Sequence, residues 1–361
     1  MHGNERQTRR GFTLVELLVT VTVIGIIVAM AMGALMSAQE TAREQRTRAV
    51  ISKLHTQLMS RWESYQTRRL PMKQINLSGQ TPGEYAFDRL RAQRELMRLE
   101  LPDRWSDVTS TLDPQAPPGS AAEVSRFKLT ELPALSESYL RRFNANTLGG
   151  QLRRPTNEFE DAECLYMIVS MGSDDAMAGQ RINPSDIADT DQDGMPEFVD
   201  GWRRPIRFLR WAPGFLPGPP YNWQSDPQDL PPGLSGTGDD ALTDLHTGNW
   251  VEDHDPFDPL KLDSPGSSVL PAAMANDVWR GYRMMPLIYS AGSDGKQDIT
   301  RATTPDVFDY STTAPLPNDP YAKADGSSGK PLDRMMGSPF DEDGDGLDHL
   351  DNITNHALEV R

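Results

Sequence analysis

The sequence predicts an α+β protein in which a long N-terminal α-helix packs on a C-terminal head with a small antiparallel β-sheet and long loops. An uncharged apolar run from Leu17 to Gln39 leads into a helical repeat of apolar residues. Short segments at 205–211 and 287–289 have the alternating or apolar pattern of strands. The chain of 361 residues contains 28 Gly and 29 Pro, which indicates long loops between these elements.

The first half of the N-terminal helix is long enough to cross a membrane. At 1.5 Å per residue, Leu17–Gln39 forms a helix of roughly 35 Å, against a hydrocarbon core of about 30 Å. The basic leader MHGNERQTRR precedes it and should stay in the cytoplasm, which leaves the head on the far side. A cleaved secretory signal is the alternative, but the run continues into a polar, periodic segment instead of a small-residue cleavage site.

The helix should continue beyond the membrane to residue 70, because Pro71 would stop it. Apolar residues recur there at steps of three and four: Ala42, Ala49, Ile51, Leu54, Leu58 and Trp62. This amphipathic half is expected to pack on the head.

Residues 71–155 read as a helical insertion, which we expect to be solvated. One helix should cover Gly83–Leu101 and end at Pro102. A second, within residues 134–150, has Ser136 as its N-cap candidate and a stop at Gly149-Gly150. The remaining residues, 156–361, form the head, where the segment 164–171 fits either a strand that echoes PLIYSAGSDG or a buried helix.

The net charge of the chain indicates which classes of partner it can bind. The formal net charge is −16, which argues against a protein that follows nucleic-acid phosphates and favours cation binding. A cluster of arginines at 89, 91, 94 and 98 is interleaved with acids, so no nucleic-acid partner is expected. The single cysteine, Cys164, cannot form an intrachain disulfide and therefore does not indicate the compartment.

An aspartate-rich stretch, DIADTDQDGMPEFVD, has the spacing of a calcium loop. Alternate carboxylates precede a glycine that permits a sharp turn, and a further acid stands at the twelfth position. The predicted ligands are Asp189, Asp191, Asp193, the Met195 carbonyl and Asp200. Because flanking helices are not evident, we expect an isolated Ca²⁺ loop and not a paired EF-hand; the alternative is a solvated acidic turn.

A second stretch, DEDGDGLDHLDN, repeats the pattern. Asp341, Asp343 and Asp345 alternate before Gly346, and Asp348 or Asp351 could complete the shell. The sequence therefore predicts one or two Ca²⁺ sites, with the first the firmer.

The stretch GFTLVELL, followed by the apolar run and a polar helix, resembles the signal of the type IV pilin and type II secretion pseudopilin superfamily. The resemblance implies that a prepilin peptidase cuts between Gly11 and Phe12 and methylates the new N-terminus. It also implies that Glu16 pairs with the N-terminal amine of a neighbouring subunit. An ionised carboxylate in hydrocarbon costs roughly 2.5–3.5 kcal/mol, so Glu16 needs such a partner unless it reaches the membrane surface.

Two head segments resemble major pseudopilins more weakly. DGWRRP and YSAGSDGK are similar to signatures that precede strands in those heads, in which a C-terminal loop binds calcium. Arg203-Arg204 replaces the Gly-Asn that is common in relatives.

No catalytic motif was found, so a non-enzymatic function is expected. The resemblance implies a structural subunit, anchored by one helix in the inner membrane with its head in the periplasm or outside the cell. Its implied partners are prepilin peptidase, other pilin or pseudopilin subunits, a secretion or pilus assembly platform and membrane lipid. The alternative is a membrane-tethered periplasmic enzyme or ligand-binding module that uses the same signal.

Overall fold

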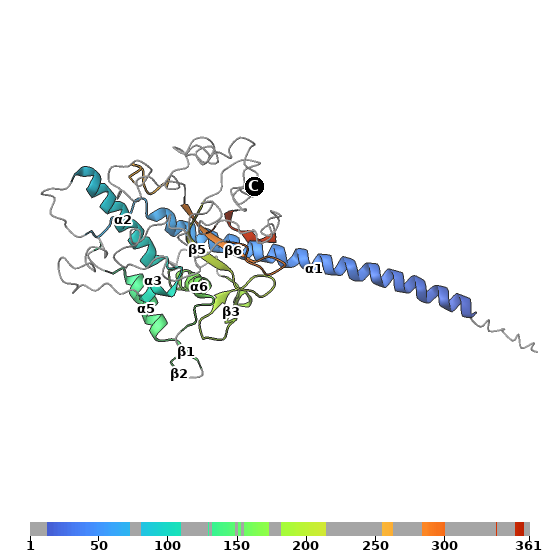
Figure 1. Ribbon diagram of the computed structural model, residues 1–361. Helices are drawn as coiled ribbons and strands as arrows, with labels where there is room; N and C mark the ends of the chain where they lie inside the picture. Colours follow the sequence, from blue (N-terminus) through green and yellow to red (C-terminus); the bar gives the residue numbers. More distant parts are fainter. Residues whose placement is uncertain are drawn as a thin grey trace, which may run out of the picture.

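The computed structural model describes residues 13–72, 81–109, 129, 132–148, 151–152, 155–172, 182–213, 255–262, 284–299, 337 and 351–356. It confirms the predicted fold class: a long N-terminal helix is combined with a head of shorter helices and small antiparallel sheets. Figure 1 shows the first half of that helix projecting from the head as a rod.

Helix α1 covers Leu14–Ser64, and its 51 residues make it about 77 Å long. Its first half is exposed along its whole length, and its second half buries one side against the head. The helix ends before the predicted residue 70. The chain turns at Tyr65, whose buried hydroxyl donates to Glu100 Oε2 at 2.8 Å. This tertiary contact ends the helix before Pro71 could do so.

The helices of the head follow in order. They are α2 (Pro82–Glu100), α3 (Trp105–Thr109), α5 (Ala134–Asn144), α6 (Glu160–Gly172) and the 3₁₀ turn η2 (Pro184–Asp186). Thr81 caps α2 through a reciprocal pair of hydrogen bonds with Glu84. The predicted cap at Ser136 is wrong, because α5 already begins after Pro133 and Ser136 is buried within it. Of the two readings of 164–171, the buried helix is correct.

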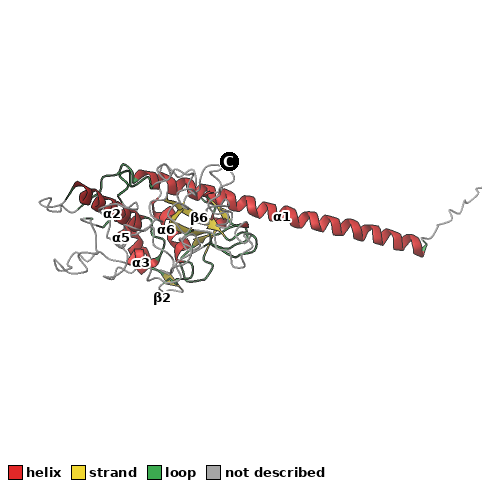
Figure 2. Ribbon diagram, turned by 45° about the horizontal axis from the view of Figure 1, so that its top comes forward, coloured by secondary structure: helices red, strands yellow, loops and turns green. Residues whose placement is uncertain are grey.

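The main sheet has three antiparallel strands in the order β5-β6-β7, which cover Arg207–Pro213, Met284–Ser290 and Ile353–Thr354. Strand β6 contains the predicted segment 287–289, and β5 overlaps the predicted segment 205–211 from Arg207 onward. Phe208 pairs with Ile288 across the two strands. Two small hairpins complete the strands: β1 (Thr147–Leu148) with β2 (Gln151–Leu152), and β3 (Ile187–Ala188) with β4 (Glu197–Phe198). The sheet lies inside the head, where β5 contacts α6 and β6 contacts α1 (Figure 2).

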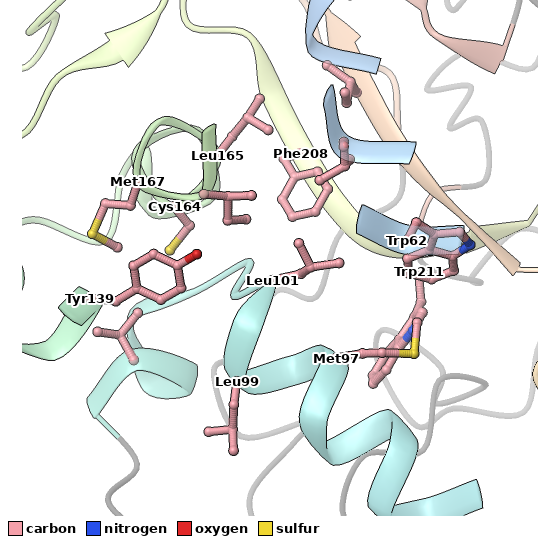
Figure 3. Close-up of a cluster of buried hydrophobic side chains, with 14 of the residues drawn as sticks. Trp62, Met97, Leu99, Leu101, Tyr139, Cys164, Leu165, Met167, Phe208 and Trp211 are labelled. Carbon is pink, nitrogen blue, oxygen red and sulfur yellow. The ribbon is translucent and has the colours of Figure 1, made fainter. Parts of the chain in front are cut away.

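One continuous core joins all these parts. Figure 3 shows Trp62 of α1, Met97 of α2, Tyr139 of α5, Leu165 of α6 and Phe208 of β5 gathered in it. The other face of the sheet carries a smaller cluster, formed by Leu209, Ala212, Leu287, Tyr289 and Ile299. Neighbouring residues Phe208 and Leu209 thus enter different clusters, and a register shift between Leu209 and Ala212 places Trp211 with Phe208 and Ala212 with Leu209.

The expectation of a solvated helical insertion is wrong. The second half of α2 is buried, and its arginines bind acids of the interior. Arg98 contacts Glu95 and Asp107, and Arg210 of β5 donates to Asp107 Oδ2 at 2.8 Å. Arg94 and Arg98 of the predicted cluster therefore lie in the interior, whereas Arg89 is exposed. The ion pairs of Arg98 and Arg210 with Asp107 hold α2 and α3 against the sheet.

Candidate functional site

The N-terminal end of α1 is organised by Thr13 and Glu16. Thr13 Oγ1 accepts from the Glu16 backbone N–H at 3.2 Å, and the Thr13 N–H donates to Glu16 Oε2 at 3.5 Å. This capping box directs the carboxylate of Glu16 back toward the start of the helix. The predicted processing residues, Gly11 and Phe12, lie outside the described residues.

The exposed half of α1 is apolar all round. Fifteen large apolar side chains between Leu14 and Met36 are exposed, with exposed fractions from 48 % at Val23 to 82 % at Leu14. Within the described residues, α1 is the one helix long and apolar enough to cross a membrane. Burying a Val, Leu or Ile side chain stabilises a protein by about 1.5–3 kcal/mol. This surface therefore requires lipid or other apolar helices around it.

The second half of α1 holds the head through the DGW turn, residues 200–202. The Gly201 N–H donates to Thr47 Oγ1 at 2.9 Å, and Trp202 Nε1 donates to Glu40 Oε1 at 2.8 Å. A Cβ atom on Gly201 would lie 2.4 Å from the carbonyl oxygen of Arg43, so only glycine fits this contact. At the DGW turn the head thus approaches the backbone of α1 closely.

The first aspartate-rich loop connects β3 to β4. Ala188 pairs with Glu197, which closes the hairpin around residues 189–196. Gly194 has φ of 100°, in the region that glycine favours, as the predicted sharp turn requires. Strands flank the loop on both sides, so the loop is not part of an EF-hand.

The loop gathers its three alternate aspartates. Oxygen atoms of Asp189, Asp191 and Asp193 lie within 4.8 Å of one another. Asp189 accepts backbone N–H groups of Asp193 and Gly194 at 3.1 and 3.0 Å. Asp193 accepts those of Met195 and Thr156. The carboxylates of Asp189 and Asp193 therefore fold the loop through its own backbone and that of Thr156.

A second group, which shares Asp191, contains two acids that sequence reasoning missed. Oxygen atoms of Glu163, Asp191 and Glu197 also lie within 4.8 Å of one another. Glu163 comes from the first turn of α6 and Glu197 from β4, and both are fully buried. Glu197 continues the every-second-residue series of the loop and could have been noticed. Glu163 is distant in sequence, and no local pattern points to it.

The electrostatics of this second group are unfavourable for bare carboxylates. Burial, reinforced by Asp193, Asp191 and Glu197, raises the pKa of Glu163 to about 10. Burial also raises the pKa of Glu197 to about 7, although the Thr190 N–H donates to it at 2.9 Å and opposes the shift. Among the described residues, both oxygens of Glu163 and Oε1 of Glu197 lack a hydrogen-bond partner.

Asp200, the predicted twelfth-position ligand, is not in either group. Its Oδ1 accepts the backbone N–H groups of Trp202 and Arg204 at 2.8 and 2.9 Å, and its Oδ2 accepts from Ser290 Oγ at 2.7 Å. Three donors thus use this carboxylate to join the DGW turn to β6. Asp200 lies beyond β4, outside the loop of residues 189–196, and its role as a Ca²⁺ ligand stays a prediction.

Of the second predicted loop, Asp341, Asp343, Asp345 and Asp348 lie outside the described residues. Asp351 lies beside the YSAGSDGK segment, where its Oδ2 accepts from Ser293 Oγ at 3.0 Å and from the Asp294 N–H at 2.9 Å. Oxygen atoms of Asp294, Asp298 and Asp351 come within 4.8 Å of one another. The occupancy of both loops by calcium stays a prediction.

Comparison with known proteins bears on the N-terminal end. Residues 6–32 match the family model of the prokaryotic N-terminal methylation motif. The chain carries a type IV pilin-type signal. This signal, followed by the apolar α1, confirms the resemblance to pilins and pseudopilins and indicates a pilin-like protein with a membrane-anchoring N-terminal helix. Proteins with this signal are structural. No curated protein and no solved structure matches the chain.

Proposed function

We propose that this protein is a subunit of a type II secretion pseudopilus or of a type IV pilus-like filament. In this proposal the helix crosses the inner membrane once and the head lies in the periplasm or outside the cell. Prepilin peptidase removes the leader after Gly11, and an assembly platform then moves the subunit into the filament. The observation that carries the proposal is the methylation motif at 6–32 together with the fully exposed apolar half of α1.

Helix α1 has an exposed apolar half and a half that contacts the head, and this supports an anchor whose surroundings can change. Within the described residues, hydrogen bonds between α1 and the head begin at Glu40, and residues 13–39 are exposed throughout. The apolar half can therefore exchange lipid for neighbouring subunits while the head stays attached. A pilin-like subunit needs this property because it is stored in a membrane before it assembles.

The first experiment tests processing. Mass spectrometry and N-terminal sequencing of the protein from its membrane should give a methylated chain that begins at Phe12. Gly11→Ala should leave a membrane-bound precursor that still carries its leader. A mature N-terminus at any other residue would defeat this part of the proposal.

The second experiment tests the assembly role of Glu16. Glu16→Val should be inserted and cleaved but should not appear in sheared filaments, because the neighbour's amine loses its partner. Glu16→Gln is the matched variant, since glutamine can preserve the capping box with Thr13 while it removes the charge. Failure of both variants supports charge pairing. Normal assembly of Glu16→Gln would mean that Glu16 serves only as a helix cap.

Filament fractions also separate the proposal from a tethered enzyme or ligand-binding module. A subunit should be recovered in sheared or purified filaments together with other pilin-like proteins. Its exclusive recovery in the membrane, under conditions in which filaments form, would favour the module.

A further inference from the structure

We propose that a calcium ion binds between α6 and the aspartate-rich loop, with Glu163, Asp191 and Glu197 as its carboxylate ligands. This site differs from the loop-only site that the spacing predicts, since it adds a helix residue and leaves out Asp200. Its three ligands all precede the DGW turn in the sequence, so the site is also distinct from the acidic group around Asp351.

The first argument is the distribution of hydrogen-bond donors. All six carboxylate oxygens of Asp189, Asp191 and Asp193 already accept hydrogen bonds, and those of Asp191 accept from the Asp193 N–H at 3.2 Å and from Thr156 Oγ1 at 2.6 Å. In the group that contains Glu163, three buried oxygens accept no hydrogen bond from the described residues: Oε1 and Oε2 of Glu163, and Oε1 of Glu197. The unused acceptors therefore converge on the α6 side of the loop, where they lie within 4.8 Å of Asp191.

The second argument is the cost of burial. Glu163 and Glu197 have no exposed surface, and a buried carboxylate is strongly unfavourable unless it is paired, protonated or bound to a metal. The buried arginines of the described residues form their ion pairs with acids outside this group, such as Asp161, Asp107 and Asp255. A divalent cation would satisfy the three unused oxygens at once.

The ligand chemistry selects the type of ion. The group offers only carboxylate oxygens, without histidine or cysteine, which suits a hard cation. Calcium accepts six to eight oxygens in irregular geometries, with distances of about 2.3–2.6 Å, whereas magnesium demands an octahedron and retains water. A buried group of carboxylates from a helix, a loop and a strand is better suited to calcium. Asp191, which is partly exposed, would lie on the side open to solvent.

The test uses the full chain, processed and solubilised in detergent, after metal has been removed with a chelator. Bound Ca²⁺ is measured by equilibrium dialysis and metal analysis, and stability by thermal unfolding. We expect Ca²⁺ to bind and, at a hundredfold excess over Kd, to raise Tm by about 5–10 °C. The absence of binding at millimolar Ca²⁺, or an equal rise in Tm with Mg²⁺, would overturn the proposal.

Glu163→Gln is the decisive variant because it keeps the side-chain volume and removes the charge. It should weaken Ca²⁺ binding at least about tenfold. Glu160→Gln is the matched control, since Glu160 lies one turn earlier on α6 and accepts the Trp105 N–H outside the group. Its Ca²⁺ affinity should equal that of the parent. Asp200→Asn should also retain the affinity.

The difference in Tm between Glu163→Gln and the parent, measured with and without Ca²⁺, distinguishes a ligand from a residue that is merely structural. In chelator, Glu163→Gln should melt at the same temperature as the parent or higher, because glutamine replaces a buried carboxyl group that is either protonated or repelled by its neighbours. In Ca²⁺ it should melt lower than the parent. A variant that melts lower under both conditions would overturn the ligand role. The same follows if Glu163→Gln keeps the affinity while Asp189→Asn or Asp200→Asn loses it, since the ion would then belong to the loop alone.

Discussion

Gly201→Ala should weaken the attachment of the head to α1. The added Cβ would lie 2.4 Å from the carbonyl oxygen of Arg43 and 2.7 Å from its Cα. Both atoms belong to the backbone of a helix, so neither can move aside by a change of rotamer. The DGW turn must therefore retreat from α1, and the bond from the Gly201 N–H to Thr47 Oγ1 at 2.9 Å must lengthen.

The magnitude follows from these two effects. Inserting a methyl group into a packed contact costs typically about 1–3 kcal/mol. A lost hydrogen bond adds about 1 kcal/mol. The sum is roughly 2–4 kcal/mol, and at about 2–4 °C per kcal/mol the Tm of the head should fall by roughly 4–16 °C.

The assay is thermal unfolding of parent and variant in the same detergent, followed by circular dichroism. Thr47→Val separates the hydrogen bond from the steric effect and should lose about 1 kcal/mol alone. Gly25→Ala is the matched control, because a Cβ atom at Gly25 meets nothing within 4 Å. A fall in Tm of less than about 2 °C for Gly201→Ala would refute the close approach on which this reasoning depends.

Two further predictions concern the buried ion pairs of α2, α3 and β5. Arg210→Met should lower the free energy of unfolding, measured in urea, by about 2–3 kcal/mol, because Asp103 and Asp107 lose the arginine they share and keep only Arg104 and Arg98. Arg89→Met, on the exposed side of α2, should change it little. Burial alone would raise the pKa of Asp103, but Arg210 and Arg104 lower it to about 2. The ionised Asp103 should therefore contribute about 2 kcal/mol to the free energy of unfolding above pH 4, and this contribution should be lost as the pH falls to 2. In urea unfolding at a series of pH values, the free energy of unfolding of Asp103→Asn should fall less between pH 4 and pH 2 than that of the parent. An equal fall in both proteins would contradict this assignment.

The anchor was predictable because its signals are local. An uncharged run long enough to cross a membrane and an amphipathic continuation determine α1 without any knowledge of the head. The strands β5 and β6 were also predicted, since Phe208 and Ile288 lie in segments with the expected pattern. The end of α1 was not, because it depends on the contact between Tyr65 and Glu100, which are distant in sequence.

The burial of α2 could not be read from its composition. Its arginines and acids alternate in a way that is typical of a solvated helix. In the structure Arg94 donates to Asp255 at 2.8 Å, and Arg98 contacts Asp107, so the charges are paired inside the head. Asp255 and Asp107 both lie outside α2, and a periodicity argument does not include such partners.

The strand β7 shows a second reason why part of the fold could not be predicted from the sequence. Two residues, Ile353 and Thr354, are too few to give a period-two pattern. Asn355 fixes this segment, because its Oδ1 accepts the Ile288 N–H at 2.7 Å and its Nδ2 lies 3.0 Å from Nδ1 of His55 in α1. A single amide side chain thus joins the end of the chain to β6 and α1, which no local pattern predicts.

The carboxylates of Asp200 and Glu163 differ in the donors that surround them, and this difference bears on the proposed calcium site. The pattern assumes that the twelfth residue turns back toward the ion, but Asp200 receives donors from Trp202, Arg204 and Ser290. A ligand at Glu163 instead would change the consequence of binding. An ion held by the loop alone would order residues 189–197, whereas an ion held also by α6 would stabilise the helix that packs against α1, β4 and β5. Calcium would then strengthen the head as a whole, including the side on which α1 is attached.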